Sequence, residues 1–297
     1  MIRRIDEKVK KYCARKYLKK NNLLEIRENS HREYIYLDEP LLFARLAGQI
    51  KNSLGAQVFM RGQPRDYLGM KPSLFRGNIN SQVQFYDRLQ AYRSLVKQLP
   101  SIFPNEESKR FRGEIGGAIL QHYGLSTPWL DLVDNIFVAL WFACWERTGT
   151  NEKFNYQKNQ EGDGWVYFLK FDGKHSHTKG IVTGTKSKWC DLRISKTSLV
   201  LRAHVQHGIL GMAKDLEFKN CDLDNLVVAS INFPTKKFAP LLSSFAPSFM
   251  FPSDKFDNTY KILHQYKPKI DLLIRDSEKS NELKTRILGV IDKFGDE

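Results

Sequence analysis

Residues 121–144, QHYGLSTPWLDLVDNIFVALWFAC, constrain the fold more than any other stretch of this chain. From Asp134 to Phe142 the side chains are almost all apolar and cover most of a helix circumference. The apolar residues at helical spacing are Val133, Ile136, Phe137, Leu140 and Cys144. A helix that is apolar on nearly every side is stable only when buried. We therefore predict a helix at the centre of a domain.

A polar cluster immediately precedes this helix and consists of His122, Tyr123, Ser126 and Thr127. Because the best-packed part of the fold holds the cluster, a ligand site placed there would be well positioned. The alternative is that His122 and Tyr123 are core residues with satisfied polar tips, and that Ser126 begins a turn. The residues alone leave both interpretations open.

The composition indicates a folded protein with a basic surface. With 297 residues, 41% of them hydrophobic, the chain can form one large domain or one domain with helical additions. A formal charge of +14 at pH 7 favours phosphate-bearing partners, which are nucleic acids, nucleotides or a membrane surface. A solvated basic surface explains the charge equally well, because no zinc-finger or RNA-recognition signature accompanies it.

The cysteines and the hydropathy pattern indicate the compartment. The four cysteines are isolated, and none has the CxxC or paired-histidine spacing of a zinc site. The chain has no signal-peptide run and nowhere the ~18 consecutive apolar residues that a membrane span requires. We expect a soluble, cytoplasmic protein that binds neither metal nor membrane. Asp254 and Asp257 could suggest a metal site, but two acids in a loop are more often a helix cap and a solvated charge, in no assigned order.

Periodicity and turn residues predict an α+β fold with a mainly antiparallel sheet and flanking helices. The predicted strands are residues 57–61, 164–171, 199–205 and 226–233, with 181–183 as a further candidate. The predicted helices are residues 2–20, 38–54, 81–99, 107–120, 134–142, 239–245, 256–266 and 270–294. The polar residues 147–164 are predicted to form a long loop.

Arginines stand where predicted elements end. Arg61 closes the first predicted strand, and the planar fork of donors on its side chain suits a phosphate or carboxylate. A surface ion pair is the alternative. Arg76 follows a turn-rich segment that we expect to lie across the site, and a later strand-to-turn segment presents Arg202 and Gln206.

Six ordered motifs resemble the FRG domain, a family named for a phenylalanine or tyrosine, arginine, glycine motif and found mostly in bacterial and phage proteins. The motifs are FMRG (59–62), PSLFR (72–76), QHYGLSTPWLD (121–131), ALWFA (139–143), RAHVQHG (202–208) and SFMFPSDKFDNTYK (248–261). The resemblance implies a helical N-terminal extension at residues 1–50, an FRG domain at 51–265 and a C-terminal helix at 266–297. The chain departs from the family at Ser126, which replaces a proline, and at Pro128-Trp129, which replaces Arg-Leu.

The order of motifs is more distantly similar to the NAD-binding half of ADP-ribosyltransferases. These enzymes have an arginine ending a first strand, then a serine-threonine turn, then an alanine-aromatic helix. The likeness implies an ADP-ribosyltransferase-like core between helical extensions, with NAD as the cofactor. The residues it implies for NAD binding are Arg61, Gly62, Arg76, His122, Tyr123, Ser126, Thr127 and Arg202.

The same likeness implies a catalytic set. Its candidates are Arg61, His122, Tyr123, Asp131, Gln206 and Glu217. Arg61 would clamp the pyrophosphate, Tyr123 would stack on the nicotinamide ring, and His122 would bond the adenosine ribose. A carboxylate, from Asp131 or Glu217, would stabilise positive charge that develops on the ribose. Gln206 could orient an acceptor.

Three function classes stay open. The first is a NAD-consuming ADP-ribosyltransferase or NAD glycohydrolase, acting as a toxin or in phage defence, with an antitoxin or defence-system protein as partner. The second is a non-catalytic nucleotide-sensing or interaction module. The third is a nucleic-acid-binding protein or ribonuclease that uses its histidines as acid and base.

Overall fold

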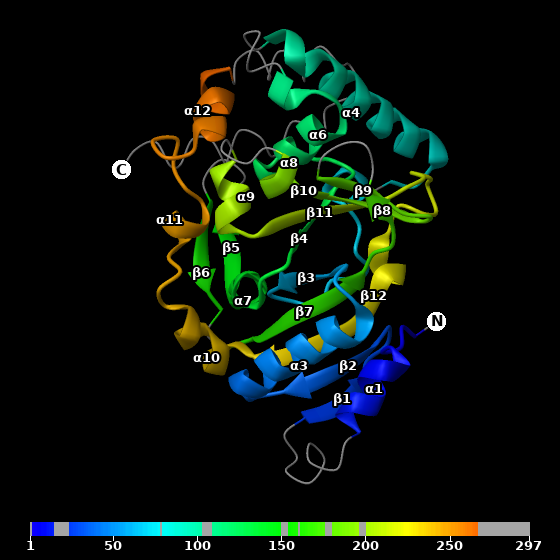
Figure 1. Cartoon of the computed structure of the whole chain (residues 1–297), viewed down its shortest axis with the longest axis vertical. Helices are drawn as coiled ribbons and strands as arrows, with labels where there is room; N and C mark the ends of the chain where they lie inside the picture. Colours follow the sequence, from blue (N-terminus) through cyan, green and yellow to red (C-terminus); the bar gives the residue numbers. More distant parts are fainter. Residues whose placement is uncertain are drawn as a thin grey trace.

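The computed structural model describes residues 2–14, 24–77, 79–102, 109–149, 154–159, 161–175, 180–195 and 200–266. These residues form a ten-stranded sheet, a separate two-stranded hairpin and flanking helices (Figure 1). The strands follow one another across the sheet as β1 (Leu24–Glu28), β2 (Glu33–Leu37), β12 (Val227–Pro234), β7 (Asp163–Lys170), β3 (Val58–Gln63), β4 (Leu130–Val133), β11 (Gly208–Ala213), β10 (Ser187–Asp191), β9 (Ile181–Thr183) and β8 (Lys174–His175). Neighbouring strands are antiparallel except β2 and β12. The predicted α+β class with a mainly antiparallel sheet is confirmed.

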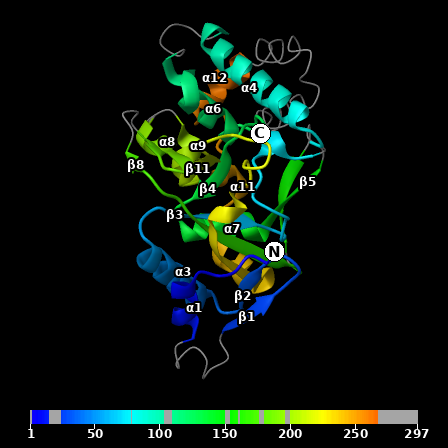
Figure 2. The same ribbon diagram turned by 90° about the vertical axis from the view of Figure 1, so that its right-hand side faces the viewer.

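Helices flank the sheet. They are α1 (Glu7–Cys13), α3 (Pro40–Leu54), α4 (Gln82–Ile102), α6 (Gly113–His122), α7 (Ile136–Cys144), α8 (Leu192–Ser195), α9 (Leu201–Val205), α10 (Thr235–Phe238), α11 (Pro247–Met250) and α12 (Asn258–Gln265). Short 3-10 turns are η1 (Ser73–Phe75), η2 (Lys109–Phe111), η3 (Leu223–Leu226) and η4 (Ala239–Leu242). Figures 1 and 2 show α1 and α3 near the β1–β2 end of the molecule, and α4, α6 and α12 at the opposite end.

Among neighbouring strands of the main sheet, β3 and β4 share the shortest pairing in the described residues. In the described chain these two strands are in register at a single pair, Met60 and Val133, whereas β3 pairs with β7 over its whole length. Beyond that pair the two strands part. The sheet therefore consists of one part ending at β3 and another beginning at β4, and backbone groups along the parting edges need other hydrogen-bond partners.

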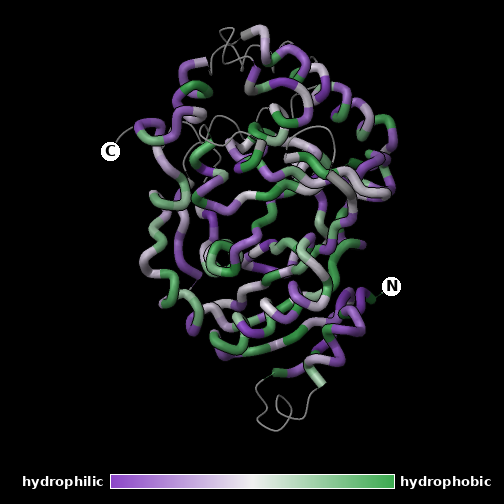
Figure 3. The backbone as a smooth tube through the Cα atoms, in the orientation of Figure 1, coloured by the Kyte–Doolittle hydropathy of each residue, from purple (hydrophilic) through white to green (hydrophobic). Residues whose placement is uncertain are grey.

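Helix α7 is the central buried helix that the sequence predicts. Asn135 caps it by accepting hydrogen bonds from the backbone of Phe137 and Val138, and the helix packs with α3 against β3, β7 and β12 in one hydrophobic core. The apolar colouring of α7 is visible in Figure 3. One detail of the prediction is wrong, since Phe137 lies on the exposed side of the first turn and is 46% exposed.

Several predicted elements differ from the structure. Residues 201–205 form helix α9 instead of a strand, and the strand follows as β11. The polar region predicted to be a loop contains the hairpin of β5 (Trp145–Gly149) and β6 (Phe154–Lys158). Pro100 does not end helix α4, which continues to Ile102. The short strand β4 was not predicted.

The N-terminal region also differs from the expected helical extension. Between α1 and α3 it contains the β1–β2 hairpin, and β2 adds to the sheet by pairing in parallel with β12. The hairpin therefore continues the main sheet. The predicted helix at 270–294, and the C-terminal segment from 267 onward, lie outside the described residues.

Other sequence-based expectations can be compared directly. The four cysteines are buried and form no disulfide bond with one another. Of the two acids, Asp257 is the helix cap: it caps α12 and accepts hydrogen bonds from the backbone of Thr259 and Tyr260. Among the described residues, no helix has the length and apolar character needed to cross a membrane.

Candidate functional site

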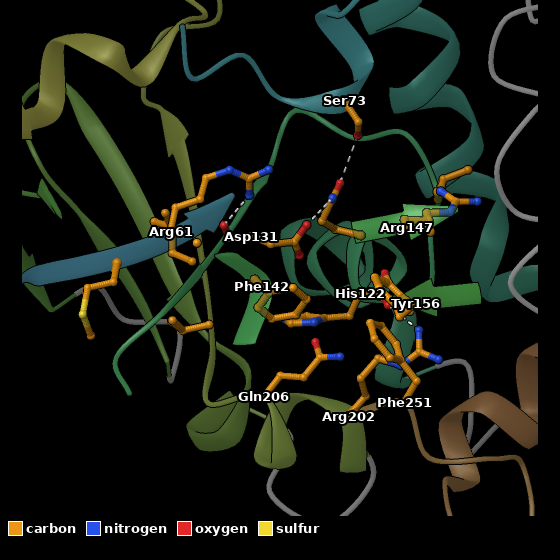
Figure 4. Close-up of a pocket in the computed structure, with 17 residues that line it drawn as sticks. Arg61, Ser73, His122, Asp131, Phe142, Arg147, Tyr156, Arg202, Gln206 and Phe251 are labelled. Carbon is orange, nitrogen blue, oxygen red and sulfur yellow. Dashed lines mark hydrogen bonds between the residues drawn. The ribbon is translucent and has the colours of Figure 1, made fainter. Parts of the chain in front are cut away.

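A cavity of about 220 Å³ lies where β3 and β4 part (Figure 4). Its lining comes from residues far apart in the sequence, on β3, η1, α6, β4, α7, β5, β6 and α9. The lining residues are Met60, Arg61, Gly62, Ser73, Gln121, His122, Gly124, Leu125, Asp131, Leu132, Val133, Phe142, Arg147, Tyr156, Arg202, Gln206 and Phe251. The structure thus places Arg61 and His122, the first residue of the polar cluster, at one cavity, whereas Tyr123, Ser126 and Thr127 do not line it.

Arg61 bridges the parting strands. Its Nη1 donates a hydrogen bond of 2.7 Å to the backbone carbonyl of Asp131 on β4, which lies just past the last paired residues. Burial lowers the pKa of Arg61, against the raising effect of the Asp131 carboxylate, but a guanidinium stays charged at physiological pH. Its Nε has no hydrogen-bond partner among the described residues, and it makes no ion pair there.

Gly62 has a packing role beside its place in the lining. A Cβ at this position would lie 1.8 Å from the carbonyl oxygen of Ala139 and 2.9 Å from the backbone nitrogen of Ala143. Helix α7 therefore approaches β3 too closely for any side chain. The two residues of the motif therefore have different roles. Arg61 bonds across the gap between β3 and β4, and Gly62 allows α7 to pack closely against β3.

Asp131 carries the carboxylate of the cavity. Its Oδ2 accepts a 2.7 Å hydrogen bond from Nε2 of Gln121. The other end of Gln121 is fixed too, because its Oε1 accepts hydrogen bonds from Ser73 Oγ at 3.3 Å and Thr127 Oγ1 at 2.5 Å. Gln121 thus orients Asp131. The sequence analysis did not single it out, although it directly precedes the histidine of the motif.

His122 ends α6 and is buried against Gly208, whose absent side chain leaves the space that the ring occupies. Burial is the main cause that lowers the pKa of His122 from 6.5; the charge of Arg202 lowers it further, and Asp131 opposes. The ring is therefore neutral at pH 7. Its Nε2 has no hydrogen-bond partner within the described part of the chain.

Arg202 is a second cation at the cavity and, unlike the half-buried Arg61, is only 1% exposed. Its Nη1 donates a 2.6 Å hydrogen bond to the backbone carbonyl of His122, and its guanidinium lies over the rings of Tyr123, Phe251 and Tyr260 at 4.7, 5.1 and 5.4 Å. Such ring faces stabilise a desolvated cation. Nε and Nη2 have no hydrogen-bond partner among the residues described.

Tyr123 does not line the cavity. Its hydroxyl donates a 2.6 Å hydrogen bond to Oδ2 of the fully buried Asp257, and its ring stacks with Tyr260 at 6.0 Å. Burial, followed by the negative charge of Asp257, raises the pKa of Tyr123. The structure thus favours the alternative reading of Tyr123 as a core residue with a satisfied polar tip, since the ring has a stacking partner within the protein.

Ser126 and Thr127 also lie outside the lining. Thr127 is fully buried; its Oγ1 donates to Gln121 and accepts from the backbone of Trp129 at 3.1 Å, so it supports the loop. Ser126 is buried in the same loop. Thr127 is linked to the site indirectly, through Gln121 and Asp131.

The remaining candidates divide between the cavity and the surface. Gln206 lines the cavity and faces the His122 ring in Figure 4, while its Nε2 donates to the carbonyl of Met250 at 2.8 Å. Arg76 is exposed outside the lining, and its Nε donates to the carbonyl of Lys71. Glu217 is also exposed and outside the lining, which leaves Asp131 as the only carboxylate in the lining among the described residues.

The sequence analysis missed one side of the cavity. Arg147 on β5 and Tyr156 on β6 line it, together with Phe142 of α7 and Phe251. Tyr156 stacks on Phe251 with ring centroids 4.7 Å apart, which packs the hairpin against the chain that follows α11. The aromatic residues within the supposed loop were the available signal.

Taken together, the lining offers side chains of the kinds that bind anions and transfer protons. It combines three guanidinium groups, one oriented carboxylate, one neutral imidazole and several aromatic rings. Within the part of the chain that the structure describes, no group of three histidine, cysteine, aspartate or glutamate side chains could hold a metal ion.

The comparisons with known proteins concern the middle of the chain. Residues 56–152 match the family model of the FRG domain, and this span includes Arg61, His122, Asp131 and helix α7. No curated protein and no solved structure matches the chain. The RAHVQHG segment lies beyond the matched residues, so its place in the domain stays a prediction, as does the likeness to ADP-ribosyltransferases. The chain therefore carries a match to the FRG domain over residues 56–152.

Proposed function

We propose that the cavity between β3 and β4 binds NAD and that the domain cleaves the bond between nicotinamide and ribose. One observation carries the proposal. Two arginines that form no ion pair with the described residues, half-buried Arg61 and buried Arg202, share a cavity with the oriented carboxylate of Asp131 and the neutral ring of His122. This set matches the needs of a phosphate-bearing substrate whose ribose becomes positively charged during the reaction.

The arginines account for the phosphate part of the substrate. In the described chain, the hydrogen bonds of both guanidinium groups go to backbone carbonyls. A buried charge without an opposite charge is costly, and charge-assisted hydrogen bonds to phosphate oxygens would offset that cost. The Nε of Arg61 and the Nε and Nη2 of Arg202 have no hydrogen-bond partner among the described residues, so each guanidinium keeps donors that a pyrophosphate would use.

The size and aromatic lining indicate which half of NAD the cavity would hold. Sites for drug-sized ligands measure roughly 300–1,000 Å³, and this cavity is smaller at about 220 Å³. It therefore suits the nicotinamide ribose half, with the adenosine half toward the opening. Phe142, Tyr156 and Phe251 offer aromatic faces and edges for a planar ring.

Asp131 would carry the electrostatic part of the reaction. When the bond between ribose C1′ and the nicotinamide nitrogen breaks, the electron pair leaves with the ring, and the sugar becomes positive. The Asp131 carboxylate, held in place by Gln121, stabilises that charge. A water molecule or an acceptor hydroxyl then forms the new bond to C1′, and His122, neutral because of burial, can take up its proton at Nε2.

Incubation of the purified full-length chain with NAD tests the proposal. Nicotinamide release is followed by chromatography and NAD binding by calorimetry. Asp131→Asn should lower the release rate about 10²- to 10³-fold without weakening NAD binding, because only the transition-state charge loses its partner. Arg61→Ala should weaken NAD binding about 10- to 100-fold, as expected from losing hydrogen bonds to a charged group. Arg76→Ala, which removes an exposed arginine outside the cavity, should change neither quantity.

Two results would refute the assignment in different ways. NAD binding by the wild-type chain with no release of nicotinamide would replace the enzyme with a nucleotide-sensing module. Absence of NAD binding, together with RNA affinity that falls steeply with salt, would favour the nucleic-acid function.

A further inference from the structure

A second, larger hollow of about 620 Å³ lies between α4, the start of α6 and the strands β10 and β11. Its lining shares no residue with the cavity that contains Arg61. The lining residues are Leu89, Tyr92, Arg93, Val96, Lys97, Pro100, Arg112, Gly113, Glu114, Pro128, Trp129, Lys188, Met212, Lys214 and Leu216. In size it falls within the range of small-molecule binding sites, roughly 300–1,000 Å³.

The wall formed by α4 has two chemically different rows. Leu89, Tyr92 and Val96 recur at helical spacing and give an apolar row, whereas Arg93 and Lys97 lie one turn apart beside it. The apolar row belongs to the core beneath α4, while both cations are exposed. Helix α4 thus contributes apolar residues to the floor of the hollow and positively charged residues to its rim.

The other walls of the hollow also combine buried apolar residues with exposed cations. Trp129 and Met212 are buried and belong to the same core, and Leu216 packs against it. Arg112 and Lys214 are exposed at the edge.

Charge at the rim is strongly unbalanced. Glu114 is the one acidic residue in the described lining, and it forms an ion pair with Lys188 at 2.7 Å. Arg93, Lys97, Arg112 and Lys214 make no ion pair with the described residues. Four cations without an acidic partner among the described residues, placed around an apolar floor, favour a ligand with an anionic head and an apolar body.

We infer that this hollow, named here the α4 pocket, is a binding site for a small anionic amphiphile with a carboxylate or phosphate head and an aliphatic tail. The tail lies along Val96, Met212 and Leu216, and the head is held by Arg93 and Lys97. A guanidinium and an ammonium on adjacent turns can both reach one anionic head. A hollow of this volume, with walls on several sides, suits such a molecule better than it suits an extended macromolecule.

Calorimetric titration with decanoate, decyl phosphate and decyltrimethylammonium separates the contributions of head and tail. The two anions should bind with one-to-one stoichiometry, and the cation of equal tail length should bind at least about tenfold more weakly. The double variant Arg93→Gln/Lys97→Gln, which changes exposed residues only, should weaken anion binding by a similar factor. The matched double variant Arg76→Gln/Lys219→Gln, which removes two exposed cations outside the pocket, should leave it unchanged.

A second substitution tests the apolar floor. Val96→Asp should abolish decanoate binding by placing a negative charge beside the tail, with the fold checked by circular dichroism. Nicotinamide release by Arg93→Gln/Lys97→Gln should equal that of the wild type, which keeps this test independent of the NAD site. Equal affinity for the anionic and cationic amphiphiles, or anion binding that survives the Arg93/Lys97 change, would overturn the assignment. So would binding of an acidic amphipathic peptide by a chain that takes up neither anion.

Discussion

Substitution of Gly62 by alanine tests the close approach of α7 to β3. The added Cβ would lie 1.8 Å from the carbonyl oxygen of Ala139, about 1.6 Å short of ordinary contact at 3.4 Å. The obstacle is helix backbone, so no side chain can rotate away. Either α7 or β3 must move, and both are fixed in the same core.

The expected cost follows from that geometry. Overpacking a core by one methyl group costs typically about 1–3 kcal/mol, and a backbone obstacle places this substitution at the top of the range or above it. We expect Gly62→Ala to lower the free energy of unfolding by about 3 kcal/mol or more. Because Gly62 also lines the cavity, NAD binding should decrease in whatever fraction remains folded.

Urea denaturation of a matched pair measures the effect. Gly48 lies in α3, where a Cβ would have nothing within 4 Å, so Gly48→Ala should raise the free energy of unfolding by up to about 1 kcal/mol through helix propensity. The two substitutions are chemically identical and should act in opposite directions. A Gly62→Ala protein as stable as the wild type would show that α7 does not pack on β3 at this distance.

Two further predictions concern the polar cluster. His122 has a pKa lowered from 6.5, so the unfolded chain takes up a proton as pH falls through 6.5 while the folded chain does not. Stability contributed by neutral His122 is therefore complete above pH 6.5 and decreases below it, by at most about 1.4 kcal/mol per pH unit. His122→Gln should flatten this part of the profile in urea denaturation between pH 7.5 and 5.5, and an unchanged slope would contradict burial of the neutral ring. Tyr123→Phe removes the hydrogen bond to Asp257 and should lower the free energy of unfolding by about 1.5–3 kcal/mol, while the affinity for NAD stays the same. A loss of NAD affinity with unchanged stability would instead support stacking of Tyr123 on the substrate.

Local patterns in the sequence determined the centre of the fold. Helix α7 was predictable because nearly every residue from 136 to 144 is apolar, and only burial satisfies such a segment. Strands β3, β7 and β12 were predictable for a similar reason, since short apolar runs ended by turn residues favour buried strands. The ordered motifs brought Arg61, His122 and Asp131 into one hypothesis, and the structure places all three at one cavity.

Tertiary contacts decided the rest. Residues 201–205 carry a pattern compatible with either a strand or a helix, and they form α9, where the backbone nitrogen of Arg202 donates to the distant Asp257. The role of Tyr123 was likewise set by a partner 134 residues away. The hairpin carrying Arg147 was predicted to be a loop because its polar sequence has no strand pattern of its own. Strands β5 and β6 form because they pair with each other. The cavity itself arises where β3 and β4 part, and strand register is a property of two segments that neither specifies alone.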